Sequence, residues 1–367
     1  MQLIEPRTSI RGFLFYILYT FINLFYVLFA LINNFICLFL GSEFIIFYNQ
    51  LYLYSNTNHG MNKIIFSLLM LVAFCNLTYS QGIKVTSNQA IPLPPSETGY
   101  SPVLSPTGDY ILITANDLKG LRKYDLATGK LSTLTTDKGA GFNVQISDDG
   151  KLVAYRSQQY KNKLRYISLK ALDVSTGKQN EVVKESRNLE QFMIKDGTVI
   201  AVDNGTLKTK RISGKALKSI PAISSISKGK LYLTRNKQTS LVSKAGDNYN
   251  YLWTSISPDG KKLLYYVIEK GKSYVSNLDG SNPISLGVLR APKWMGNNWV
   301  IGMEDYDNGT VITSSRIIAV AANGTNRTAL TDNTVIATNP SGTSDATKIV
   351  YNTADGKIHL MNIEITK

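Results

Sequence analysis

Cysteine and histidine are scarce in this sequence, which has 2 of each among its 367 residues. A zinc cluster, an iron–sulfur site or a disulfide-rich scaffold needs more ligands than these. Both cysteines, Cys37 and Cys75, precede residue 81, where we expect the exported chain to begin. The chain from residue 81 onward is therefore predicted to have no disulfide and no nucleophilic thiol, and its one histidine is His359.

Acidic residues are also few, with 26 Asp and Glu against 40 Lys and Arg, which gives a formal net charge of +14. Hydrophobic residues make up 44% of the chain. That apolar content is enough for a sizeable core, so a wholly disordered chain is excluded.

The first 80 residues are unlike the rest. Residues 13–40 are apolar and uncharged, over a length sufficient for a membrane span. A second start follows at Met61: Lys63 is basic, residues 64–74 are apolar, and small residues end at Ser80. This order predicts a signal peptide over 61–80, cleaved before Gln81, and hence a periplasmic or secreted protein. Residues 1–60 are then either an upstream extension absent from the native protein or a membrane span.

Beyond residue 81 the chain repeats a unit of short strands separated by turns. In the clearest unit, the strand 252–256 is followed by Ser257-Pro258-Asp259-Gly260 and then by an apolar strand, a turn and a third strand. Similar turns begin at Ser105 and Ser147, and weaker ones lie near residues 196, 228, 297 and 344. The mean interval is about 40 residues, close to the ~40–45 residues of a four-stranded propeller blade.

These Ser-Pro-Asp-Gly units resemble the WD-like repeats of TolB-type β-propellers over residues 81–367, without the α/β domain that precedes the TolB propeller. The resemblance implies an all-β, seven-bladed β-propeller. The last unit is one strand short, and we expect the segment 83–91 to pair with 358–365 and close the ring. Six blades are the alternative, because units three and four are only about 31–32 residues apart and could merge. An open β-sandwich with similar turns is the other alternative.

The resemblance favours an exported, non-enzymatic binding module or protein–protein scaffold of the cell envelope. A carbohydrate- or polyanion-binding protein is the second hypothesis, and a relative of propeller-type hydrolases or lyases is the third. Against the third, the chain has no G-x-S-x-G motif. The histidine-rich metal site of oligogalacturonate lyases is missing as well. We assign no catalytic residue and no cofactor, and the acidic run 304–309 is the candidate for calcium.

A basic sector lies between Asp203 and Asp247, where ten Lys and Arg residues occur without one acidic residue. It is either a solvated outer face or a surface for an acidic polysaccharide or an envelope protein. Nucleic acid is disfavoured, since no RNP-like aromatic motif or recognition helix accompanies the charge. The candidate polyanion-binding residues are Lys208, Lys210, Arg211, Lys228, Lys230 and Arg235.

Aromatic residues cluster in units five and six. Stacked on a sugar ring they would form a glycan site, but propellers also use aromatic side chains to fill the space between blades. The candidate glycan-stacking residues are Tyr249, Tyr251, Trp253 and Trp294.

Overall fold

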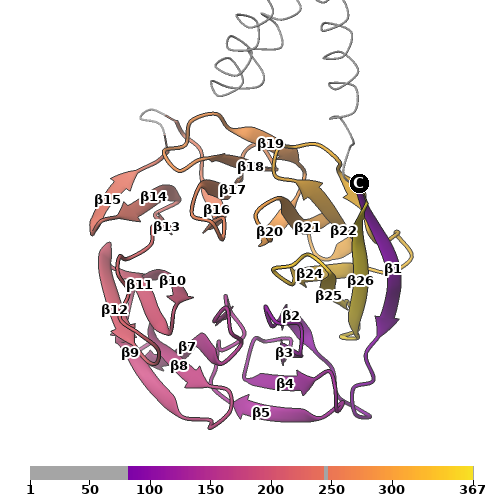
Figure 1. Cartoon of the computed structure of the whole chain (residues 1–367), viewed down its shortest axis with the longest axis horizontal. Coiled ribbons are helices and arrows are strands. Elements are labelled where there is room, and N and C mark those ends of the chain that lie inside the picture. Colours follow the sequence, from indigo (N-terminus) through magenta and orange to yellow (C-terminus); the bar gives the residue numbers. More distant parts are fainter. Residues whose placement is uncertain (1–81, 244–246, 367) are drawn as a thin grey trace, which may run out of the picture. The chain divides into compact units, whose positions relative to one another are not determined.

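The computed structural model describes residues 82–243 and 247–366, and this part of the chain is built from β-strands alone. No helix in this part is long and apolar enough to cross a membrane. The segments 1–60 and 61–80, for which a span and a signal peptide are predicted, lie outside the described residues. Seven antiparallel sheets stand around a common centre (Figure 1), which confirms the seven-bladed propeller and rules out the open sandwich.

Five of the blades have four strands. Blade 1 contains β2 (Tyr100–Leu104), β3 (Tyr110–Thr114), β4 (Leu121–Asp125) and β5 (Leu131–Thr135). Blade 2 contains β6 (Gln145–Ile146), β7 (Leu152–Lys161), β8 (Leu164–Asp173) and β9 (Gln179–Ser186). Blade 5 contains β16 (Tyr251–Ile256), β17 (Lys262–Val267), β18 (Lys272–Asn277) and β19 (Ile284–Gly287). Blade 6 contains β20 (Arg290–Met295), β21 (Trp299–Asp307), β22 (Ile312–Ala321) and β23 (Thr328–Ala329).

Blade 7 is completed by the two ends of the described chain. It contains β24 (Ala337–Gly342), β25 (Lys348–Thr353), β26 (Ile358–Thr366) and, as its outer strand, β1 (Gly82–Ala90). In the β1–β26 ladder Ile83 lies opposite Ile365, and Ala90 lies opposite His359. The predicted closure by the segment 83–91 is therefore confirmed.

Blades 3 and 4 have only three strands each. Blade 3 contains β10 (Leu189–Lys195), β11 (Thr198–Asp203) and β12 (Thr206–Arg211), and blade 4 contains β13 (Ile223–Ser227), β14 (Lys230–Arg235) and β15 (Gln238–Leu241). The short spacing of units three and four reflects the missing fourth strands. The two units do not merge, so the six-bladed alternative is wrong.

In all blades except blade 4, the first turn, between the innermost and second strands, contacts the first turn of a neighbouring blade. The Ser344 hydroxyl donates to the carbonyl of Pro106, and Lys195 pairs with Asp148 at 2.9 Å. These turns share one face of the ring, here called the turn face. The opposite face, here called the hairpin face, carries the second turns and the connections between four-stranded blades.

Blade 4 is the exception to this arrangement. Its first turn does not join the others, because the Tyr251 amide donates a 2.9 Å hydrogen bond to the carbonyl of Gly229. Tyr251 begins β16 on the hairpin face, so the Lys228–Gly229 turn lies on that face too. The cause is the odd number of strands in blade 3. After three strands the chain ends on the turn face, where the Ser213 amide donates a hydrogen bond to the carbonyl of Gly197. The three strands of blade 4 run in the opposite direction and return the chain to the hairpin face.

The Ser-x-Asp-Gly turns are stabilised by their own side chains. The Ser257 hydroxyl donates to Asp259 at 2.6 Å and accepts from the Lys262 amide at 2.9 Å, and Ser147 bonds Asp149 in the same way. Gly260 has a φ of 75°, in the left-handed region that glycine adopts without strain. The Asp and Gly of the repeat thus serve the turn, and they carry no information about a ligand.

Candidate binding surfaces

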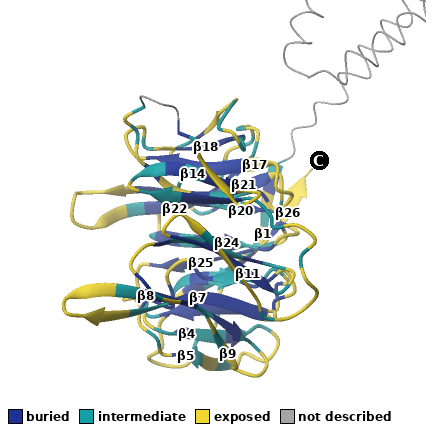
Figure 2. Ribbon diagram, turned by 90° about the vertical axis from the view of Figure 1, so that its left-hand side faces the viewer, coloured by how far each residue is buried: buried dark blue, intermediate teal, exposed yellow. Residues whose placement is uncertain are grey.

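Two hairpins are longer than the rest, and they are the second hairpins of blades 2 and 6. The second strands of the other blades have five or six residues, whereas β7 has 10 and β21 has 9. Figure 2 shows both hairpins projecting from the same side of the ring with their tips exposed. Tyr160 is 66% exposed on one, and Tyr306 is 59% exposed on the other.

Exposed large apolar side chains concentrate on the hairpin face. Of the fourteen in the described residues, eleven lie on second hairpins, on connections between blades, or where an innermost strand begins. They are Phe142, Tyr160, Leu164, Leu252, Trp253, Ile268, Val288, Tyr306, Val311, Ile312 and Val335, and the others are Leu241, Ile284 and Ile365. A concentration of apolar side chains on one face is typical of an interaction surface.

The acidic run 304–309 forms ion pairs with arginines. Glu304 accepts hydrogen bonds from Arg316 and Arg327, while Asp305 pairs with Arg290 at 3.1 Å. Burial alone would raise the pKa of Glu304, but the hydrogen bonds from the two arginines outweigh it and lower the pKa. Within the described residues, no group of three or more acidic, His or Cys side chains is arranged to hold a metal ion. Calcium therefore gains no support here.

The candidate glycan-stacking residues do not form one surface. Tyr251 is 6% exposed and lies edge-on to Tyr265, with ring centroids 5.6 Å apart. The Lys270 ammonium covers the ring of Tyr249 at 4.7 Å, and Trp294 packs partly buried between blades 5 and 6. Trp253, 41% exposed, is the member of the set that presents a ring to solvent.

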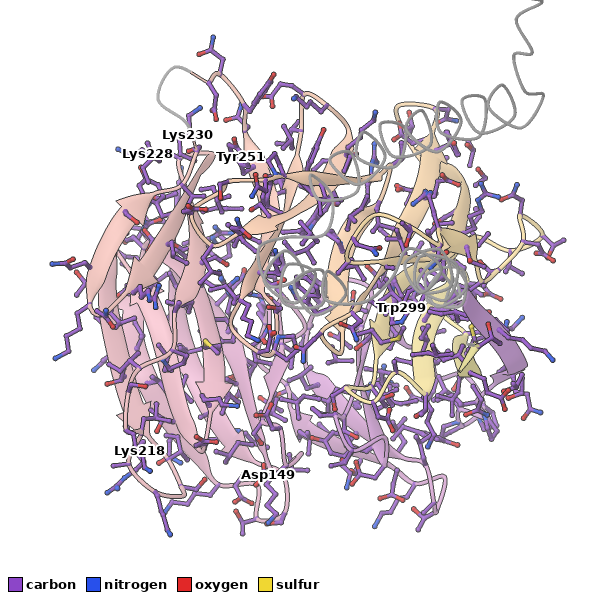
Figure 3. The ribbon with its side chains drawn as sticks, turned by 45° about the horizontal axis from the view of Figure 1, so that its top comes forward. Asp149, Lys218, Lys228, Lys230, Tyr251 and Trp299 are labelled. Carbon is purple, nitrogen blue, oxygen red and sulfur yellow. The ribbon has the colours of Figure 1, made fainter. Side chains whose placement is uncertain are left out.

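The candidate polyanion-binding residues divide into two groups. Lys208, Lys210 and Lys230 are held within the protein: by Asp203 at 2.5 Å, by the carbonyl of Glu181, and by the carbonyls of Asp247 and Tyr249. Arg211, Lys228 and Arg235 are exposed and have no partner within the described residues. Because blade 4 is inverted, Lys228 lies on the hairpin face beside Tyr251, whereas Lys218 lies well apart (Figure 3). In blades 3 and 4, the exposed cations of the turn face that have no partner among the described residues are Arg211, Lys215, Lys218, Arg235 and Lys237.

His359 belongs to the closing strand β26. Its ring stacks on Tyr351 with centroids 5.0 Å apart, and its Nδ1 is buried without a hydrogen-bond partner. Burial lowers the pKa of His359. This placement is that of a core-edge residue.

Two cations were not singled out from the sequence, one on an innermost strand and one on a second strand. The seven innermost strands carry four charged residues, of which Glu190, Lys195 and Arg290 have partners, whereas Lys293 has none within the described part of the chain. Burial lowers the pKa of Lys293 to about 8. The other cation is Arg156 on β7, a residue only 7% exposed. Neither stands out in the sequence, because only the packing of the blades shows that each lacks a counter-charge.

No protein-family model and no curated protein matches the chain. The solved WD40 repeats of RRP9 are similar in structure, with a TM-score of 0.52 and 10% identity over 77% of this chain and 100% of that one. A chain of the mitotic checkpoint complex is similar with a TM-score of 0.51 and 9% identity, over 76% of this chain and 94% of that one. This chain is a seven-bladed β-propeller with WD-like repeats.

Two further solved propellers are similar at lower TM-scores. TolB from Acinetobacter baumannii has a TM-score of 0.45 and 15% identity, with 66% of this chain and 56% of that one covered. An oligogalacturonate lyase in complex with manganese has a TM-score of 0.43 and 13% identity, with 72% and 76% covered. The predicted likeness to TolB-type propellers therefore concerns the fold, and the ligand must be argued from this chain's own surface.

Proposed function

We propose that this propeller is a non-enzymatic binding module, a protein scaffold of the cell envelope that binds its partner protein with the hairpin face. The observation that carries the proposal is the distribution of exposed apolar side chains, eleven of fourteen on one face. Two long hairpins, tipped by Tyr160 and Tyr306, extend that face beyond the ring. Exposed tyrosines are favourable contact residues, since each combines a large apolar ring with a hydroxyl for hydrogen bonding.

Export belongs to the same proposal. The signal-peptide pattern over 61–80 predicts a periplasmic or secreted protein, and the partner would then be another exported protein. Sequencing the amino terminus of the protein recovered outside the cytoplasm tests this part. We expect Gln81 as the first residue, and a product that retains residues 13–40 would instead indicate an anchored form.

Affinity capture from an envelope extract tests the binding face. The immobilised wild type and the double variant Tyr160→Ser/Tyr306→Ser are compared with the control Ile284→Ser/Ile365→Ser, which removes exposed apolar side chains outside the hairpin face. We expect one polypeptide to be retained by the wild type and the control and lost by the hairpin variant. Equal retention by all three proteins would refute binding through this face.

Binding of an acidic polysaccharide is the second candidate function. It is favoured by the exposed cations Arg211, Lys215, Lys218 and Arg235, which have no partner in residues 82–243 and 247–366 and line the outer part of blades 3 and 4 on the turn face. These blades lack a fourth strand, so their outer strands β12 and β15 leave an open sheet edge. The two candidate functions use opposite faces of the ring and are separable by mutation.

A further inference from the structure

Arg156 is a buried cation with no counter-ion in the described part of the chain. Its Nη2 donates to the carbonyl oxygen of Glu190 at 3.2 Å, and its Nε is buried without any hydrogen-bond partner. Burial, and secondly the positive charge of Arg165, lowers the pKa of Arg156 to about 10. The nearby Glu190 carboxylate is occupied by the Gly205 amide and the Asn188 side chain. A buried charge is usually paired, so this one lacks its complement.

Two phenylalanine rings flank the guanidinium. The centroid of Phe142 lies 5.2 Å from the Arg156 Cζ, and that of Phe192 lies 5.5 Å away. Phe192 is 1% exposed, whereas Phe142 is 49% exposed. Cation–π contacts hold the guanidinium in a fixed position but accept none of its hydrogen bonds. The guanidinium makes one hydrogen bond, from Nη2. Its Nη1 and the second hydrogen of Nη2 have no acceptor among the described residues.

This arrangement lies on the hairpin face. Phe142 lies on the connection that leads into β6, the innermost strand of blade 2, and Glu190 is near the start of the innermost strand of blade 3. Both strands leave the hairpin face. The projecting β7–β8 hairpin begins its free part just after Arg156, as the Gln158 amide bonds the carbonyl of Lys138. The unpaired cation therefore lies at the base of the hairpin that carries Tyr160.

We propose that Arg156 is a carboxylate-binding residue of the hairpin face and that the partner protein supplies an acidic side chain or a C-terminal carboxylate to it. The inference rests on the proposed function and adds the chemistry by which the partner is recognised. A guanidinium binds a carboxylate through two parallel N–H···O hydrogen bonds in one plane. A carboxylate carries one charge and is less costly to bury than a phosphate dianion, which favours it in this apolar setting.

Small carboxylates test the proposal without the partner. In a ¹H–¹⁵N spectrum, the Arg156 side-chain resonance, assigned with Arg156→Lys, is followed during titration with sodium acetate, which mimics an acidic side chain. A second titration uses N-acetylglycine, which mimics a chain terminus, and a third uses sodium chloride at matched ionic strength. We expect a saturable shift with one or both carboxylates and none with chloride. The carboxylate that binds more tightly identifies the source. Equal shifts with all three salts, or none, would overturn the proposal.

Two methionine variants separate ligand binding from a structural role. Arg156→Met keeps the length and apolar contacts of the side chain, and Arg211→Met is the matched control at an exposed arginine on the turn face, away from this site. If Arg156 serves a ligand, Arg156→Met melts at or above the wild-type temperature and loses the rise in melting temperature that acetate gives the wild type and the control. A lower melting temperature with an unchanged acetate effect contradicts the proposal.

The outcomes of the two proposals are distinguishable. If the carboxylate titrations show no binding but capture still depends on Tyr160 and Tyr306, the role of Arg156 is refuted and binding through the hairpin face stands. A carboxylate effect without any captured protein would remove the protein partner and leave an anion site.

Discussion

The amide of Tyr251 donates a hydrogen bond to the carbonyl oxygen of Gly229, with a nitrogen-to-oxygen distance of 2.9 Å. Through this contact the first turn of blade 4 lies at the start of blade 5, on the face opposite to the first turns of the other blades. The inversion follows from two consecutive three-stranded blades, since each odd blade transfers the chain to the other face. It separates Lys228 and Lys230 from Arg211 and Arg235, which are close to them in the sequence.

Closure of the ring by β1 is expected to contribute strongly to stability. Ile83 is 7% exposed and packs in the cluster between blades 6 and 7, while its neighbour Lys84 is exposed on the same strand. Ile83→Ala is expected to reduce the free energy of unfolding by about 2–4 kcal/mol. Lys84→Ala, the matched control, should change it by no more than about 0.5 kcal/mol. Urea unfolding followed by circular dichroism measures both, and equal midpoints would argue against closure by this strand.

The turns and the closure were predictable from the sequence because their causes are local or can be counted. The Ser, Asp and Gly of a turn interact within a few residues of one another. The last repeat is one strand short, so a strand from elsewhere in the chain must complete the last blade. The missing fourth strands of blades 3 and 4 were visible only as a short interval. The isolation of Arg156 depends on Phe142, Phe192 and Glu190, which belong to two blades, so no sequence spacing indicates it.

The turn aspartates should make stability depend on acid pH. Hydrogen bonds from Ser147 and Ser257 lower the pKa values of Asp149 and Asp259, and those from Ser175 and Thr176 lower the pKa of Asp173 to about 2. The unfolded chain, with Asp near ~3.9, then binds more protons below pH 5 than the folded chain. The stabilisation is present above the unfolded pKa and is lost as the pH falls through the folded values.

A serine variant checks this dependence. Ser257→Ala should cost about 1 kcal/mol at pH 6, where Asp259 is ionised and bonded to the hydroxyl. The difference between wild type and Ser257→Ala should shrink at pH 3, because the stabilisation from the lowered pKa of Asp259 is progressively lost below the unfolded value of ~3.9. Urea unfolding of both proteins at the two pH values gives the comparison. A difference that is constant between pH 3 and pH 6 would show that the aspartate takes no part.

Lys293 should titrate near pH 8. Burial lowers its pKa to about 8, and it has no partner among the described residues. The folded protein binds fewer protons than the unfolded chain between about pH 8 and the ~10.4 of a free lysine, so stability from this residue rises with pH in that range. Lys293→Met should therefore be more stable than the wild type at pH 7, with an advantage that declines above pH 8. Melting curves at pH 7 and pH 9 test this, and the ¹³Cε shift of Lys293 gives its midpoint directly; a midpoint near 10 would refute it.

The free cations of the turn face give the last prediction, which concerns the second candidate function. Arg211, Lys215 and Lys218 are exposed, have no partner among the residues that the structure describes, and lie on one face. Reversing all three to Glu should therefore abolish most retention on a polygalacturonate column. Retention of the wild type should fall steeply with salt, since exposed charges are screened beyond a Debye length of ~8 Å at physiological ionic strength.

The control is Lys228→Glu, an equally exposed cation that blade 4 presents on the hairpin face, and it should elute close to the wild type. Exposed substitutions change stability by only about 0.5 kcal/mol, so all of these proteins should remain folded. If the triple variant elutes with the wild type, the sector is a solvated face. If Lys228→Glu lowers retention in proportion to its one reversed charge against the three of the triple variant, retention depends on net charge and not on where the cations lie.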